Sequence, residues 1–393
     1  MASFRNLSAA GFAATAITYG PARMGFGLFL PEFRDDFALS TGMAGLISSL
    51  GFLGMLLGLV AAYATLALAG PRPPVLLGLG LATFGTALVS GATGLPMLAL
   101  GIVLAMASAG FAWTPFNNIV SRRLPDETRP SALAIISTGT SLGIAAAGAT
   151  AIAVSLSGLP WRMAWAAFAG ASALALLANI TALREPSGPL GASTPVAPWA
   201  SLLHGSAMPL YAIALSFGTT TAIYFSFAAD RIVQAGGVPG MPSGSSPAIL
   251  FLCFGVFGLL GLATGRIKGI IGLSVLLRGL LVASALSLGL VAAMPASWSG
   301  VVLSAGLQGV FVMIMSAVLA FWSERLFPHM PARSFTAALI AVALGSVLGP
   351  VVAGTVSDIW GGEVMFLGTA VLSITTMPVI QPRLVQERPG PAV

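Results

Sequence analysis

Long apolar runs separated by short polar intervals make up most of the 393-residue chain. A membrane helix needs about 20 mainly apolar residues, so the pattern predicts twelve helical spans. They lie near residues 8–32, 42–68, 74–92, 95–121, 130–156, 160–183, 205–230, 246–265, 270–292, 297–322, 334–357 and 362–380. We therefore predict an all-α polytopic membrane protein with twelve transmembrane helices.

The longest polar interval, residues 184–204, is rich in Pro, Gly and Ser and divides the chain in the middle. It predicts an N-terminal six-helix bundle (1–183), a cytoplasmic linker (184–204) and a C-terminal six-helix bundle (205–393). Only 7% of the residues are charged, against about 25% in a soluble domain, which agrees with a membrane protein.

The net charge of +6 is explained by topology. If both termini are cytoplasmic, most of the 17 basic residues fall in or beside cytoplasmic segments, as the positive-inside rule requires. No long basic run and no aromatic–basic interleaving indicates nucleic-acid binding. We expect a multi-pass protein of the bacterial inner membrane, surrounded by the lipid bilayer, with both termini cytoplasmic.

The two parts of the chain repeat one another. Gly139 and Gly143 align with Gly345 and Gly349 at one fixed offset, and further positions of the first helix align with the seventh. These further positions are Gly20, Arg23, Phe26 and Glu32, matched by Gly218, Thr221, Tyr224 and Asp230. Two parallel six-helix repeats are typical of rocking-bundle transporters, whose binding site lies near the midplane between the bundles. The repeats thus predict two pseudo-symmetric bundles.

Several segments carry a family resemblance. They are Gly-Phe-Ala-Trp-Thr-Pro-Phe-Asn-Asn at 110–118, Ser-Arg-Arg-Leu-Pro-Asp-Glu-Thr-Arg at 121–129, Ile-Ser-Thr-Gly-Thr-Ser-Leu-Gly at 136–143, and Gly20-x-x-Arg23 with Pro31. With them the chain resembles a major facilitator superfamily transporter over essentially its whole length, in a bacterial branch of arabinose-efflux-like permeases. The loop after the second helix departs from the family pattern, with only Gly-Pro-Arg-Pro at 70–73.

Arg23 is the first candidate site residue because it carries a full charge inside the first apolar run. An Arg at the centre of a membrane helix costs roughly 2.5–3.5 kcal/mol on insertion scales. Tyr19 lies four residues earlier, so both side chains project from one helix face. A guanidinium in a cavity of low dielectric binds carboxylate, sulfonate or phosphate groups. The alternative is a structural Arg paired with carbonyls or a neighbouring Asn.

The resemblance implies that helices 1, 4, 7 and 10 line a central cavity. The polar and aromatic candidates on the last three are Trp113, Thr114, Asn117, Thr221, Tyr224 and Gln308. The alternative is that such groups only join helices by hydrogen bonds. Thr138, Thr140 and Ser141 are expected to pack beside the glycines of the fifth helix.

No Asp or Glu lies at mid-membrane in the predicted spans. Glu32 and Asp230 fall at the outer ends of the first and seventh helices, and Glu324 at the inner end of the tenth. They are our gating or coupling candidates, with solvated helix-end charges as the alternative.

We predict a secondary active transporter that moves a small organic, anionic solute by alternating access, with or without a co-transported ion or proton. A multidrug or sugar efflux permease is the alternative. His204 and Met208 form a His-x-x-x-Met pair that suits Cu(I), which leaves a copper permease as a further alternative. With two His, one Cys and no buried acid pair, the sequence offers no catalytic set. We expect no enzyme activity, no cofactor and a monomer.

Overall fold

The computed structural model describes residues 2–184, 202, 205–381 and 385. Almost all of the predicted linker, 184–204, lies outside them. Within the described residues the chain is helical, without a β-strand. The elements before the linker are α1 (Ala2–Tyr19), α2 (Pro21–Leu28), α3 (Leu30–Phe37), α4 (Thr41–Ala69), α5 (Arg72–Ser90), α6 (Leu95–Gly110), α7 (Trp113–Arg123), α8 (Arg129–Leu156) and α9 (Trp161–Ala182).

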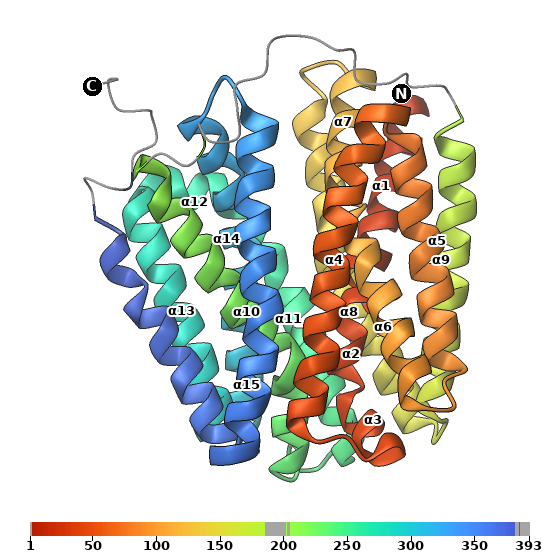
Figure 1. Cartoon of the computed structure of the whole chain (residues 1–393), viewed down its shortest axis with the longest axis vertical. Coiled ribbons are helices and arrows are strands. Elements are labelled where there is room, and N and C mark those ends of the chain that lie inside the picture. Colours follow the sequence, from red (N-terminus) through yellow and green to blue (C-terminus); the bar gives the residue numbers. More distant parts are fainter. Residues whose placement is uncertain (1, 185–201, 203–204, 382–384, 386–393) are drawn as a thin grey trace.

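The second part begins with the short helix η2 (Gly205–Ala207). It continues with α10 (Met208–Gln234), η3 (Ser243–Ser245), α11 (Ser246–Gly258), η4 (Leu259–Ala263), α12 (Thr264–Ile271), α13 (Leu273–Ala293), α14 (Trp298–Leu326), α15 (Pro331–Thr375) and η5 (Met377–Val379). Figure 1 shows α1–α9 on one side of the molecule and α10–α15 on the other. We call these two sets the N-terminal and C-terminal halves.

Ten helical stretches among the described residues are long and apolar enough to cross a membrane. One of them, α15, contains two crossings because Gly361 interrupts it at φ 85°, a conformation that favours glycine. The first predicted span is present as α1 and α2, broken at Gly20. The twelve predicted crossings are therefore confirmed.

The glycines that repeat in the sequence make equivalent contacts in the two halves. A Cβ on Gly143 of α8 would overlap the backbone of Ala16 in α1, and one on Gly345 of α15 would overlap the carbonyl of Leu215 in α10. Close approach of helix backbones is the usual role of such residues in membranes. The fifth span thus packs on the first as the eleventh packs on the seventh.

The two halves are joined most tightly at the end of the molecule that carries α3, opposite the end at which α1 begins (Figure 1). We call these ends the α3 face and the terminus face. Toward the α3 face, Ser48 of α4 and Ser226 of α10 share a hydrogen bond of 2.5 Å. The backbone N–H of Val351 donates to Ser49 Oγ at 3.0 Å, immediately after Pro350 interrupts the ladder of α15. These contacts close the α3 face.

Gly27 provides a test of this closure. It lies in α2, and a Cβ there would overlap the carbonyl oxygen of Phe225 in α10. We expect Gly27→Ala to destabilise the closed protein by about 1–3 kcal/mol, the usual cost of overpacking, and to lower its melting temperature in nanodiscs. Gly80→Ala in α5 is the matched control, because nothing lies within 4 Å of a Cβ there. Equal melting temperatures for the two variants would contradict the close packing of α2 on α10.

Candidate functional site

A cavity of about 240 Å³ lies between the two halves, on the terminus side of the contacts that close the α3 face. The N-terminal half contributes residues of α1, α2, α4, α6, α7 and α8, and the C-terminal half residues of α10, α11, η4, α14 and α15. Its volume is below the 300–1,000 Å³ typical of sites for drug-sized ligands. The cavity therefore suits a small solute.

Three helical spans break where they pass this cavity. Pro21 follows the break at Gly20, and Pro115 follows the break between α6 and α7. A proline has no N–H and clashes with the carbonyl four residues earlier, which explains both breaks. The third break is η4, which begins directly after Gly258. Broken helices at membrane depth are tolerated where they line a cavity or lie within protein.

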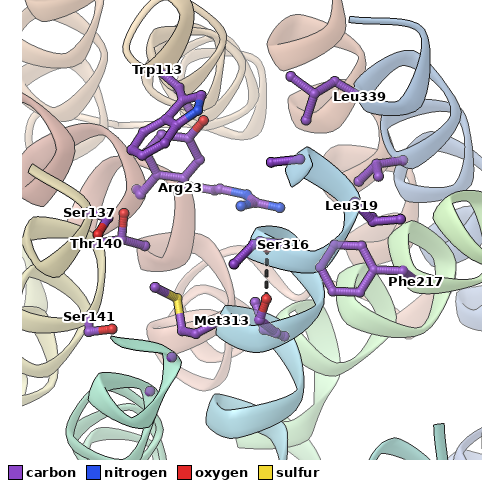
Figure 2. Close-up of a pocket in the computed structure, with 18 of the residues that line it drawn as sticks. Arg23, Trp113, Ser137, Thr140, Ser141, Phe217, Met313, Ser316, Leu319 and Leu339 are labelled. Carbon is purple, nitrogen blue, oxygen red and sulfur yellow. Dashed lines mark hydrogen bonds between the residues drawn. The ribbon is translucent and has the colours of Figure 1, made fainter. Parts of the chain in front are cut away.

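Arg23 projects into the cavity from α2 (Figure 2). The rings of Tyr19, Phe52 and Phe225 surround it, with their centroids 5.6, 5.7 and 5.6 Å from Cζ. Its Nε is buried without a hydrogen-bond partner. Cation–π contacts within about 6 Å are attractive but leave the five N–H donors of a guanidinium unmatched. Arg23 is thus held in place with hydrogen-bonding capacity to spare.

The basic residues Arg34, Arg162 and Arg231 of the α3 face are paired with acids. Arg34 contacts Asp230, Arg162 contacts Asp36 at 2.7 Å, and Arg231 lies 3.9 Å from Glu363. No acidic side chain lines the cavity in the described part of the chain. Arg23 therefore differs from these three in having no carboxylate beside it there.

The structure brings together four of the predicted site residues. Tyr19, Arg23, Trp113 and Thr114 all line the cavity. Asn117 lies one turn further along α7 and does not line it.

The three predicted residues of the C-terminal half are buried outside the cavity lining. The Tyr224 hydroxyl shares a hydrogen bond of 3.1 Å with Ser304. The hydroxyl of Thr221 and both amide atoms of Gln308 have no hydrogen-bond partner. In this state none of the three lines the cavity.

Hydroxyl residues of α8 occupy part of the wall that sequence reasoning assigned to other positions. Thr138, Thr140 and Ser141 line the cavity, although we expected them to pack beside the glycines. Both roles are met on one helix, because Gly139 and Gly143 face α1 while the hydroxyl residues between and beside them face the cavity. The alternation of Gly with Ser and Thr was the signal available in the sequence.

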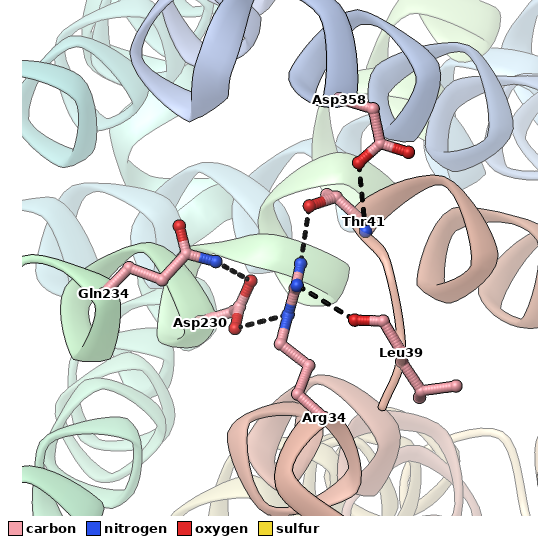
Figure 3. A network of polar contacts seen from close by, with 6 residues as sticks. All are labelled: Arg34, Leu39, Thr41, Asp230, Gln234 and Asp358. Atoms are coloured by element: carbon pink, nitrogen blue, oxygen red, sulfur yellow. Dashed lines mark hydrogen bonds and ion pairs between the residues drawn. The ribbon is translucent and has the colours of Figure 1, made fainter. Parts of the chain in front are cut away.

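A second polar cluster closes the α3 face (Figure 3). Arg34 Nε of α3 lies 2.9 Å from Asp230 Oδ1 of α10. Arg34 also donates to the Leu39 carbonyl at 3.1 Å and to Thr41 Oγ1 at 2.6 Å, and Gln234 donates to Asp230 at 2.9 Å. The side chain of Asp230 is 5% exposed. The cluster therefore joins the two halves through a largely dehydrated ion pair.

Asp358 of α15 adds a second connection at the same face. Its carboxylate accepts hydrogen bonds from the backbone N–H groups of Thr41 at 3.1 Å and Gly42 at 2.8 Å. Thr41 is the first residue of α4. A carboxylate at a helix N-terminus satisfies unpaired N–H groups and is favoured by the helix dipole. Asp358 thus caps a helix of the opposite half.

The remaining acidic candidates have separate positions. One carboxylate oxygen of Glu32 is buried without a hydrogen-bond partner, and Glu324 is exposed near the terminus-side end of α14. Arg34 was not among our candidates. It could have been found as a basic residue on the predicted outer side, where the positive-inside rule leaves few of them.

The copper alternative depends on His204 and Met208. His204 lies outside the described residues, and Met208 is 54% exposed at the start of α10. Within the described ranges no three His, Cys, Asp or Glu side chains form a potential metal-binding group.

Comparison with known proteins identifies the family to which this chain belongs. A family model described as Major Facilitator Superfamily matches residues 12–280, more than half of the chain. The chain belongs to the Major Facilitator Superfamily. It is a multi-pass membrane transporter, as the resemblance implied. A search among curated proteins finds no match in sequence.

Solved structures of major facilitator transporters share the fold. A bacterial homolog of the human lysosomal transporter Spinster, inward-facing and unoccupied, has a TM-score of 0.77 at 15% identity, covering 99% of each chain. The nucleoside transporter NupG has a TM-score of 0.72 at 16% identity, covering 97% of this chain and 100% of its own. A POT family transporter in complex with 5-aminolevulinic acid has a TM-score of 0.76 at 13% identity, covering 98% and 96%. At these identities the likeness is one of fold alone.

Proposed function

We propose that this protein is a secondary active transporter of a small organic anion across the bacterial inner membrane, and that Arg23 binds the anion. The observation that carries this proposal is an arginine at membrane depth whose guanidinium faces a cavity that no acidic side chain lines among the described residues. An intramembrane charge is costly and is retained in general for a function. A solute carboxylate would supply the missing counter-ion through charge-assisted, bidentate hydrogen bonds.

Alternating access follows from the placement of the cavity. The halves 1–183 and 205–393 move as two bundles in this proposal, and the described state is closed at the α3 face. With both termini in the cytoplasm, as the distribution of basic residues favours, the cavity belongs to the inward-facing state. Opening to the outside then requires the contacts of the α3 face to separate.

Arg34, Asp230 and Asp358 form the gate of the α3 face in this scheme. All three make contacts between the halves that an outward-facing state cannot keep. Breaking a buried ion pair leaves uncompensated charge, so the gate needs a compensating interaction in the open state. A proton or a co-transported cation at Asp230 or Glu32 would provide it, which makes these two carboxylates the coupling candidates.

Solute counterflow tests the proposed function. Purified protein in proteoliposomes, preloaded with one unlabelled solute at a time, is offered trace labelled monocarboxylates, sugars and aromatic acids. We expect transient accumulation of at least one organic anion and no accumulation of neutral sugars. Protein-free liposomes are the control for diffusion. Flat traces for every anion, with accumulation of a neutral solute, would contradict the proposal.

A further inference from the structure

The two walls of the cavity differ in polarity (Figure 2). The N-terminal half presents Arg23, Tyr19, Trp113 and the hydroxyl residues of α8. The C-terminal half presents Phe217, Leu259, Val312, Met313, Leu339 and Val342 among its apolar residues. Ser316 is the one polar side chain of that wall among the described residues, and its hydroxyl already donates to the Val312 carbonyl at 2.7 Å. One wall is therefore cationic and polar, and the other is apolar.

The polar groups of the N-terminal wall differ in how much of their hydrogen-bonding capacity is already used. Ser137 and Thr138 donate to carbonyls of their own helix, at 2.9 and 2.7 Å. Ser141 Oγ and Arg23 Nε have no partner. A solute with hydroxyl groups all around it would leave several of them unpaired against the opposite wall, at about 1–3 kcal/mol each. This arrangement disfavours sugar-like solutes.

The charge of the solute is limited by the same lining. One guanidinium balances one negative charge, whereas a phosphate monoester carries about −1.5 to −2 at neutral pH. A dicarboxylate would place its second charge against apolar side chains. A zwitterion would bury an ammonium group without a carboxylate beside it, because no Asp or Glu lines the cavity in the described residues.

We propose that the solute is an amphipathic monoanion, whose carboxylate binds Arg23 and whose apolar body lies against the α10, α14 and α15 wall. This inference rests on the proposed function and adds the class of anion to it. The aromatic rings around Arg23 exclude water from the ion pair, and the apolar wall selects the rest of the solute. Recognition then depends on one charge and on the apolar area that the solute buries.

Matched six-carbon compounds test this class. Binding to the wild-type protein in lipid nanodiscs is measured by calorimetry for hexanoate, adipate, 6-aminohexanoate, gluconate and hexanamide. We expect hexanoate to bind at least tenfold more tightly than each of the others. In the series acetate, butyrate and hexanoate, each added methylene should tighten binding by up to about fourfold until the cavity is filled.

Variants separate the two proposals. Met313→Ser on the apolar wall should reduce the gain in affinity from butyrate to hexanoate severalfold. The matched control is Leu303→Ser, on the same helix but 56% exposed and outside the cavity lining. It should keep the full chain-length dependence.

Two further sets of results distinguish a failure of the amphipathic class from a failure of the proposed function. If adipate or gluconate binds as tightly as hexanoate and Arg23→Gln abolishes binding of all anions, the amphipathic class is wrong and the anion transporter stands. If hexanamide binds as tightly as hexanoate, or Arg23→Gln binds all anions normally, the proposed function itself fails.

Discussion

Replacing Arg23 with Gln should reduce anion counterflow on the order of a hundredfold or more. Removing one partner of a buried, hydrogen-bonded charge pair costs about 2–5 kcal/mol, and each 1.4 kcal/mol is tenfold in affinity. Arg23→Lys should retain part of the activity, because a lysine keeps the charge but loses the planar fork that binds a carboxylate through two hydrogen bonds. Initial rates in proteoliposomes, normalised to reconstituted protein, measure both effects.

Arg266→Gln is the matched control for this substitution. Arg266 is exposed on α12 and does not line the cavity, so transport should stay near wild type. All three variants should elute as monodisperse protein with unchanged helical circular dichroism. Full transport by Arg23→Gln would show that the anion does not bind at Arg23.

Asp230→Asn should open the α3 face. The substitution removes the charge partner of Arg34 across the two halves, and breaking a buried ion pair costs about 3–5 kcal/mol. That is enough to shift a two-state equilibrium by more than a hundredfold. Spin labels at Ala38 and Trp360, both exposed near the α3 face, should report a longer distance than in wild type. The labelled wild-type and Asp230→Asn proteins both carry Cys253→Ser, because Cys253 is the one native cysteine of the sequence.

Asp36→Asn is the matched control for the gate. Asp36 pairs with Arg162 at the same face but within the N-terminal half, and both side chains are more than a third exposed. Hydrogen bonds from Arg162 and Trp161 hold the pKa of Asp36 below its ordinary value. This pair therefore stabilises the fold at neutral pH and loses that effect as the pH falls through the lowered pKa. Its loss should cost at most about 1 kcal/mol and leave the label distance unchanged.

A double-mutant cycle identifies the coupling across the gate. Arg34→Gln combined with Asp230→Asn should open the α3 face no further than Asp230→Asn alone, because the ion pair is already absent. Additive opening by the two substitutions would show that they act independently, which contradicts a gate built on this pair.

The span pattern was predictable because the bilayer leaves few alternatives. Every backbone polar group must be satisfied within the span, so apolar run length alone places the helices. The glycine repeats were equally informative, since Gly143 and Gly345 permit the same helix contact in the two halves. The break at Gly361 separates the last two spans between the predicted ends at 357 and 362.

The site was predictable only in part, because rotation about each helix axis is set by packing. Tyr19 and Arg23 are four residues apart and were predicted to project from one helix face, and both line the cavity. Gln308 lies on a cavity helix, yet its side chain is fully buried away from the cavity in this state. The partner of Arg34 could not be found from spacing, since Asp230 belongs to the other half of the chain. Contacts between the halves depend on the conformational state of the whole protein, and the sequence of a single helix does not determine that state.

The most direct measurement is a structure of the protein with the anion that counterflow identifies. We predict that its carboxylate oxygens lie about 2.7–2.9 Å from the Arg23 guanidinium nitrogens, the usual length of such charge-assisted bonds, with the apolar body against Val312 and Met313. A bound anion elsewhere in the protein, with Arg23 still surrounded by aromatic rings alone, would contradict the account.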